Sequence, residues 1–189
     1  SGFIPYRDFF DMNMPGVYFI NLLSAKIFGW SDLSFRVFDI VYLCVLSFFT
    51  FLWLKPFGKL TSVSGVLLFG LYYINETPYL ILQREYFALL PFAVMLCLLI
   101  HKSNLSFGRI LFFSGILTAL TFLIKPHFII LSLPAIGIFI YENRLKLRKQ
   151  LKYLVTGFSI PVIVFLLYLT FTGSLNSFLD IVFNRLYSS

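Results

Sequence analysis

The sequence predicts an all-α polytopic membrane protein: a bundle of about six transmembrane helices with interfacial helices on its outer face. Of its 189 residues, 59% are apolar and only 12% are charged, whereas soluble domains have about 45–50% apolar and about 25% charged residues. The mean hydropathy is +0.90. These values exclude a disordered chain, a nucleic-acid-binding domain and an ordinary soluble enzyme, because so few charged residues would not cover the surface of a soluble globule.

The first expected helix covers residues 15–29, with Pro15 at its start and Gly29 at its end. Proline suits the first position of a helix and glycine the position after its last turn. Polar residues interrupt the apolar run, so we expect this helix to lie at the membrane interface or to pack against the bundle.

Six apolar runs reach or approach the roughly 20 residues that a spanning helix needs. They lie at residues 33–54, 60–76, 86–101, 108–125, 127–141 and 153–172. A last segment, 174–189, has apolar residues at helical spacing with polar residues between them. We expect three regions: a partial first outer loop with an interfacial helix (1–32), the transmembrane bundle (33–172), and an outer amphipathic segment that begins a further region (173–189).

The basic residues predict the orientation of the bundle. Short loops place successive helix ends on alternate sides, and one side then receives nine of the 15 Lys and Arg residues. By the positive-inside rule this side is cytoplasmic. The nine are Lys55, Lys59, Lys102, Arg109, Arg144, Lys146, Arg148, Lys149 and Lys152.

The acidic residues have the opposite distribution. Only Glu142 is expected on the cytoplasmic side, and the other seven of the eight acids fall on or near the outer side. Acids contribute little to membrane topology, so insertion does not explain this bias. The bias favours a binding or reaction site on the outer face, although outer loops also simply tolerate polar residues.

The N-terminal segment is the richest in groups that could do chemistry. Asp8 and Asp11 are three residues apart and share a face if the segment is helical. Paired acids near a bilayer supply a general base or a cation ligand, and Arg7 is suited to pair with either acid or with a phosphate. The alternative is a loop that aromatic side chains anchor at the interface, with its acids facing water.

Two further groups are expected on the outer side. Arg84 and Glu85 begin one span, where an acid also stabilises a helix start. Lys125 lies in a tight hairpin near membrane depth, where it either extends towards water or binds an anion. Within the first span, Arg36 and Asp39 are expected to pair with each other. The sequence has no phosphate-binding glycine loop, HExxH or CxxC motif, so we assign no cofactor, and a divalent metal ion stays open.

The outer segments resemble those of GT-C-fold glycosyltransferases, in the bacterial branch related to dolichyl-phosphate-mannose-protein mannosyltransferases that includes the aminoarabinose transferases of lipid A. The resemblance covers most of the chain. The similar residues are GFIPYRDFFD at 2–11, MPGVY at 14–18, Phe28-Gly29, Arg36, Gln83-Arg84-Glu85 and Lys125-Pro126.

The resemblance implies an integral enzyme of the bacterial inner membrane that works at the extracytoplasmic face. It implies a polyprenyl-phosphate sugar as donor, a lipid, glycan or protein as acceptor, and inversion at the sugar, with membrane lipids and no nucleic acid as further partners. The residues expected to take part are Asp8 and Asp11 as catalytic acids, Lys125, Arg84 and Arg7 at the donor phosphate, and Glu85, His127, Tyr6 and Asn13 at the substrate.

The chain departs from the family pattern at two places. The catalytic acid of relatives often precedes the Pro-Tyr-x-Asp segment and would fall before Ser1, so we expect a fragment that is inactive alone. Relatives often have a Lys before a Pro-Pro pair, where this chain has Asn13, Met14 and Pro15. The alternative function is non-catalytic, as a lipid or sugar transporter or a scaffold subunit. A transporter would have ionisable groups near mid-span, whereas an enzyme would bring its charged outer residues to one cavity beside a lipid-accessible groove.

Overall fold

The computed structural model describes residues 5–6, 8, 14–76, 83–101, 105–143 and 147–181. All the regular elements of the described residues are helices, which confirms the predicted all-α class. They are α1 (Gly16–Phe28), α2 (Asp32–Leu54), η1 (Lys55–Phe57), α3 (Lys59–Asn75), α5 (Arg84–His101), α6 (Phe107–Ile124), η2 (Pro126–Phe128), α7 (Ile129–Glu142), α8 (Leu147–Phe171) and α9 (Leu175–Asp180).

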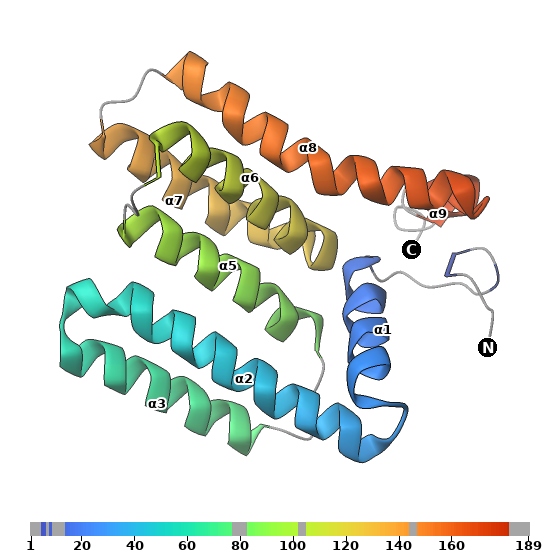
Figure 1. The fold of residues 1–189 in the computed structure, drawn as a ribbon, viewed down its shortest axis with the longest axis horizontal. Coiled ribbons are helices and arrows are strands. Elements are labelled where there is room, and N and C mark those ends of the chain that lie inside the picture. The colour runs from blue at the N-terminus through green and yellow to red at the C-terminus, as the bar shows by residue number, and fades with distance from the viewer. Residues whose placement is uncertain are drawn as a thin grey trace.

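The six longer helices after α1 run roughly side by side, while α1 crosses steeply at one end of the bundle (Figure 1). Within the described residues, four helical segments are long and apolar enough to cross a membrane. The helices α3 and α7 are shorter; α3 packs against α2, and α7 packs against α5 and α6. Many large apolar side chains on the bundle surface are exposed, as expected where lipid is the solvent. The four segments are Asp32–Phe57, Arg84–His101, Phe107–Ile124 and Gln150–Phe171.

Local sequence signals define the ends of α1 and α2. The helix α1 begins directly after Pro15 and ends at Gly29, which has a φ of 97° that favours glycine. The next helix starts after Ser31, whose hydroxyl accepts a hydrogen bond from the backbone N–H of Ser34 at 3.2 Å. This side-chain cap satisfies a free donor of the first turn, and the predicted boundaries of α1 are confirmed.

The closest helix contact joins α6 and α8 through two glycines. A Cβ atom on Gly157 would lie 2.0 Å from the carbonyl oxygen of Phe112, and one on Gly115 would lie 2.3 Å from that of Leu154. Small residues allow helix backbones to approach closely in a membrane. This pair therefore fixes α8 against α6, although α7 lies between them in the sequence.

The bundle has two chemically different ends. The mixed-charge end contains the starts of α2 and α5 and the end of α6, and its described residues include most of the acids together with Lys125. The basic end contains the end of α2 and the starts of α3, α6 and α8. Apart from Glu142 at the end of α7, the charged side chains described there are cationic: Lys55, Lys59, Arg109, Arg148 and Lys152.

Candidate functional site

Lys125 and Glu85 form an ion pair at the mixed-charge end, with the ammonium Nζ donating to the carboxylate Oε1. Lys125 follows the last residue of α6, and its extended backbone agrees with the restriction that Pro126 imposes on the preceding residue. Glu85 lies in the first turn of α5. The Lys125 side chain is 23% exposed and that of Glu85 48% exposed, so the pair lies at the rim of the bundle.

Two other predicted residues flank this pair along the chain. Arg84 begins α5 directly before Glu85, and its side chain is half-buried. His127 lies in η2, two residues after Lys125, and is exposed. The structure therefore brings the Arg84–Glu85 segment and the Lys125–His127 segment, which the sequence suggested separately, to one corner of the bundle.

The N-terminal segment reaches the same corner through Tyr6. Its side chain is buried in a cluster that includes Leu123 and Phe165, and its ring makes an edge contact with Phe178 at a centroid distance of 5.1 Å. Tyr6 has a φ of 68°, which is uncommon for a residue other than glycine. Asp8, two residues further, is exposed. Tyr6 thus anchors the segment that carries Asp8.

Three of the predicted site residues lie outside the described part of the chain. They are Arg7, Asp11 and Asn13.

An apolar cavity of about 620 Å³ lies between α1, α5, α6 and α8. Its wall includes Ile124, which directly precedes Lys125, and Phe87, which follows Glu85 by two residues. The start of α1 closes against α6 at Gly16, where a Cβ atom would lie 2.7 Å from the Ile124 side chain. A cavity with almost only apolar walls suits a hydrocarbon chain.

A buried polar cluster supports the start of α5. The Tyr73 hydroxyl donates to Oδ1 of Asp39 at 2.5 Å, and the Tyr86 hydroxyl donates to the Asp39 carbonyl oxygen at 3.3 Å. The Tyr42 hydroxyl donates to the carbonyl oxygen of Phe87 at 2.6 Å. These bonds join α2, α3 and α5 next to Glu85, because Tyr86 and Phe87 directly follow it in the chain.

The predicted pair of Arg36 with Asp39 is wrong. Asp39 is only 5% exposed and hydrogen-bonds Tyr73, whereas Arg36 is exposed and forms no ion pair among the described residues. A buried carboxyl requires a hydrogen-bond donor. The tyrosines in three of the predicted spans were the signal available in the sequence, because a tyrosine hydroxyl can donate to a buried carboxyl.

The described residues contain no group of three or more His, Cys, Asp or Glu side chains that could hold a metal ion. The described groups at this corner include a cation–carboxylate pair, a neighbouring arginine and an apolar cavity. Together these groups can hold an amphiphile with an anionic head and a hydrocarbon tail.

Comparison with known proteins gives one result. No curated protein and no solved structure matches the chain. The family model described as dolichyl-phosphate-mannose-protein mannosyltransferase matches residues 13–169, which span α1 to α8. The match covers most of the chain, and the helical membrane bundle agrees with it. The chain therefore belongs to the dolichyl-phosphate-mannose-protein mannosyltransferase family, a GT-C-type family of membrane glycosyltransferases.

Proposed function

We propose that the protein transfers a sugar from a polyprenyl-phosphate donor to a lipid, glycan or protein acceptor at the extracytoplasmic face of a bacterial inner membrane. One observation carries the proposal: the Lys125–Glu85 pair lies close along the chain to Ile124 and Phe87, which line a 620 Å³ apolar cavity. A polyprenyl phosphate has the same two parts, an anionic head and a long hydrocarbon tail. The excess of cations at the opposite end supports the outward orientation of this site.

In this proposal Lys125 binds the donor phosphate, and Arg84 adds a second cation. The pair with Glu85 does not prevent this, since a partly exposed ion pair contributes only about 0–1 kcal/mol. A phosphate held between Lys125 and Arg84 accepts a hydrogen bond from each cation, and a hydrogen bond to a charged group contributes roughly 1.5–3 kcal/mol. With two cations the phosphate competes successfully for Lys125, and Glu85 becomes free to accept a hydrogen bond from the substrate.

The hydrocarbon tail of the donor occupies the apolar cavity between α5, α6 and α8. Burial of apolar surface stabilises such a complex by about 25 cal/mol per Å², so several isoprene units contribute more than the head group. A tail in the cavity also keeps the phosphate near Lys125, because Ile124 in the cavity wall directly precedes this lysine. The sugar is then held outside the cavity, at the rim.

An outer-loop carboxylate acts as the base. Asp8 is the candidate among the described residues, because it is exposed and follows the buried anchor Tyr6; Asp11 is the second candidate. The carboxylate takes the proton of the acceptor hydroxyl, and the hydroxyl oxygen attacks the anomeric carbon. The bond from this carbon to the phosphate oxygen breaks on the opposite face, so polyprenyl phosphate leaves and the sugar inverts.

The remaining predicted residues have secondary roles in this proposal. His127 is exposed close to Lys125 along the chain and is available to bind the sugar or the acceptor. Tyr6 acts through its position in the core, and Arg7 and Asn13 are proposed to contact the phosphate and the substrate. The family match begins at residue 13. The proposed role of Asp8 as the base is therefore supported by its exposure, by its position after Tyr6 and by the resemblance of the loop.

The test uses the natural protein, purified from membranes, with a polyprenyl-phosphate sugar as donor. We expect Lys125→Gln to raise the donor KM by about tenfold or more, as the loss of a charged hydrogen bond predicts. We expect Asp8→Asn to abolish transfer while donor binding persists. Lys26→Gln is the matched control, since Lys26 is an exposed cation at the same end and should leave both constants unchanged. Equal effects of Lys125→Gln and Lys26→Gln would refute the phosphate site.

A further inference from the structure

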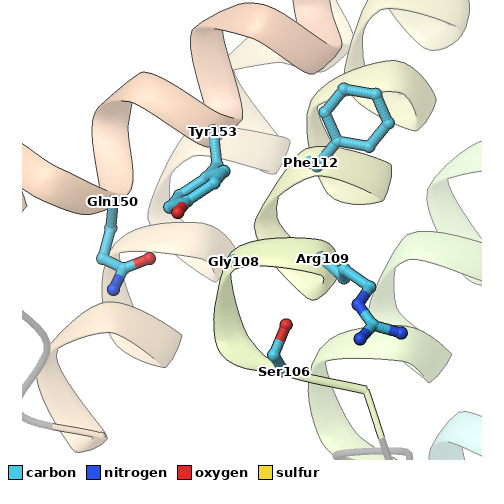
Figure 2. Close-up of a pocket in the computed structure, with 6 residues that line it drawn as sticks. All are labelled: Ser106, Gly108, Arg109, Phe112, Gln150 and Tyr153. Carbon is cyan, nitrogen blue, oxygen red and sulfur yellow. The ribbon is translucent and has the colours of Figure 1, made fainter.

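Two adjoining hollows lie at the basic end, between the first turns of α6 and α8 (Figure 2). Their volumes are about 400 and 520 Å³, and Phe112 and Tyr153 line both of them. Figure 2 shows Gln150 and Tyr153 on α8 facing Ser106 and Gly108 at the start of α6. Because the two hollows share Phe112 and Tyr153, we call them together the basic groove; it lies at the end of the bundle opposite Lys125.

Three cations line this groove without compensation. Arg109 lines the first hollow, and Arg148 and Lys152 line the second. None of the three forms an ion pair with a described residue, and no acid lines either hollow. Glu142, the acid described at this end, is exposed at the end of α7 and lies outside the lining. Cations gathered in this way attract an anion.

Neutral polar groups in the groove also lack partners within the described residues. Oε1 of Gln150 is buried and accepts no hydrogen bond, although a buried polar atom without a partner is costly. Ser106 precedes α6, and its hydroxyl makes no capping bond to the first turn. An oxygen-rich ligand with a hydroxyl would satisfy these groups, because the amide of Gln150 both donates and accepts.

A glycine and two aromatic residues determine the shape of the groove. A Cβ atom on Gly108 would lie 3.1 Å from the ring of Tyr153, so glycine at this position allows the ring to lie against the backbone of α6. Phe112 forms the other aromatic wall. On α8, Leu151 and Val155 directly precede Lys152 and Thr156 in the chain. They line neither hollow but are 41% and 58% exposed, and this apolar border of α8 suits acyl chains.

We propose that this groove binds the phosphodiester head group of an anionic membrane lipid. Basic pockets between transmembrane helices bind such head groups, and Arg148, Lys152 and Arg109 supply charge-assisted hydrogen bonds to phosphate oxygens. The apolar border of α8 favours a lipid over free phosphate. The site is separate from the proposed transfer site, and its occupancy can be measured without any sugar transfer.

Basic residues at one end of a bundle also orient the protein in the membrane, but this role requires no groove. Lys55 and Lys59 are suited only to this orienting role, since both are exposed at the same end and line neither hollow. The double variant Lys55→Gln, Lys59→Gln is therefore a control that removes the same charge as Arg148→Gln, Lys152→Gln.

The experiment places the natural protein in nanodiscs of equimolar phosphatidylcholine and phosphatidylglycerol and counts retained lipids by native mass spectrometry. A cation beside a bound anionic head group contributes about a fivefold gain in affinity for that lipid. We expect phosphatidylglycerol retention to fall about 25-fold in Arg148→Gln, Lys152→Gln and about fivefold in Arg109→Gln. We expect no change in the Lys55 and Lys59 control, and near-complete retention in the charge-preserving Arg148→Lys, Lys152→Arg.

Four results would overturn the proposal. The first three are an equal loss of phosphatidylglycerol in the Lys55 and Lys59 control, retention of phosphatidylcholine to the same degree as phosphatidylglycerol, and full displacement of the lipid by inorganic phosphate, which would make free phosphate the ligand. Because Arg148→Lys, Lys152→Arg retains the charges, loss of lipid from this variant as well would attribute the effect to altered packing and also contradict the proposal.

Discussion

The charged groups at the two ends of the bundle differ in whether they have a partner. At the mixed-charge end, Lys125 has Glu85 as its partner and the buried Asp39 carboxyl has Tyr73. At the basic end, Arg148 and Lys152 line a groove without any partner among the described residues. Paired groups are held in position, whereas unpaired groups are available to a ligand. The comparison suggests that the first end is built for a defined geometry and the second for attraction of an anion.

The largest effect is expected at the α6–α8 contact, on which both ends of the bundle depend. Gly157→Ala places a methyl group against the Phe112 carbonyl oxygen, where the Cβ distance would be 2.0 Å, so α6 and α8 must separate. We expect a loss of about 3 kcal/mol or more in stability, at the upper range of overpacking, with both donor and lipid binding weakened. Thermal unfolding in detergent measures it.

Gly137→Ala is the matched control for this prediction. A Cβ atom on Gly137 in α7 would meet nothing within 4 Å, so alanine should stabilise the helix by roughly 0.5–1 kcal/mol. Equal unfolding temperatures for the two variants would show that the α6–α8 contact does not support the two ends.

The next effect concerns the mixed-charge end alone. Asp39→Ala leaves the Tyr73 hydroxyl without its acceptor, and we expect a loss of about 2–3 kcal/mol, as for a buried hydrogen bond to a charged group. Donor KM should rise because the start of α5 moves, while lipid retention at the basic end stays unchanged. Asp39→Asn keeps an acceptor oxygen and should recover most of the loss.

Asp32→Ala serves as the control for Asp39. Asp32 is an exposed acid in the first turn of the same helix, where the helix dipole makes it worth about 0.3–1 kcal/mol. If Asp32→Ala raised the donor KM as much as Asp39→Ala, the effect would be one of general charge and not of the buried cluster.

The smallest effect is expected from Glu85→Gln. It removes the partner of Lys125 at an exposed site, so stability should change by less than about 1 kcal/mol. The freed ammonium should bind the donor up to about fivefold more tightly, while turnover with acceptor falls if Glu85 contacts the substrate. Donor titration separates the two effects, and weaker donor binding would contradict competition between Glu85 and phosphate for Lys125.

Much of the fold was predictable because its signals are local. Pro15 and Gly29 defined α1, and the apolar runs gave the six longer helices within a few residues, apart from the earlier start of α8 at Leu147. The amphipathic segment predicted at 174–189 is described only as far as 181 and contains the short α9.

The contacts between helices were not predictable in the same way. The helix α6 is apolar on all sides, so its pattern does not indicate which face meets α8. The bond from Tyr73 to Asp39 joins residues 34 positions apart, and it depends on how α2 and α3 are rotated against each other. Charge counts alone predicted that Arg84, Glu85 and Lys125 share one end, but only the fold placed Glu85 on Lys125.

The most direct test is photo-crosslinking of the natural protein with a polyprenyl-phosphate analogue that carries a diazirine in its hydrocarbon chain. If the apolar cavity holds this chain, the label should attach to cavity residues such as Leu90, Leu117 and Val164, and Lys125→Gln should reduce it. Labelling of the lipid-exposed Leu67 and Leu71 on α3 with equal yield, unchanged in Lys125→Gln, would contradict the proposed donor site.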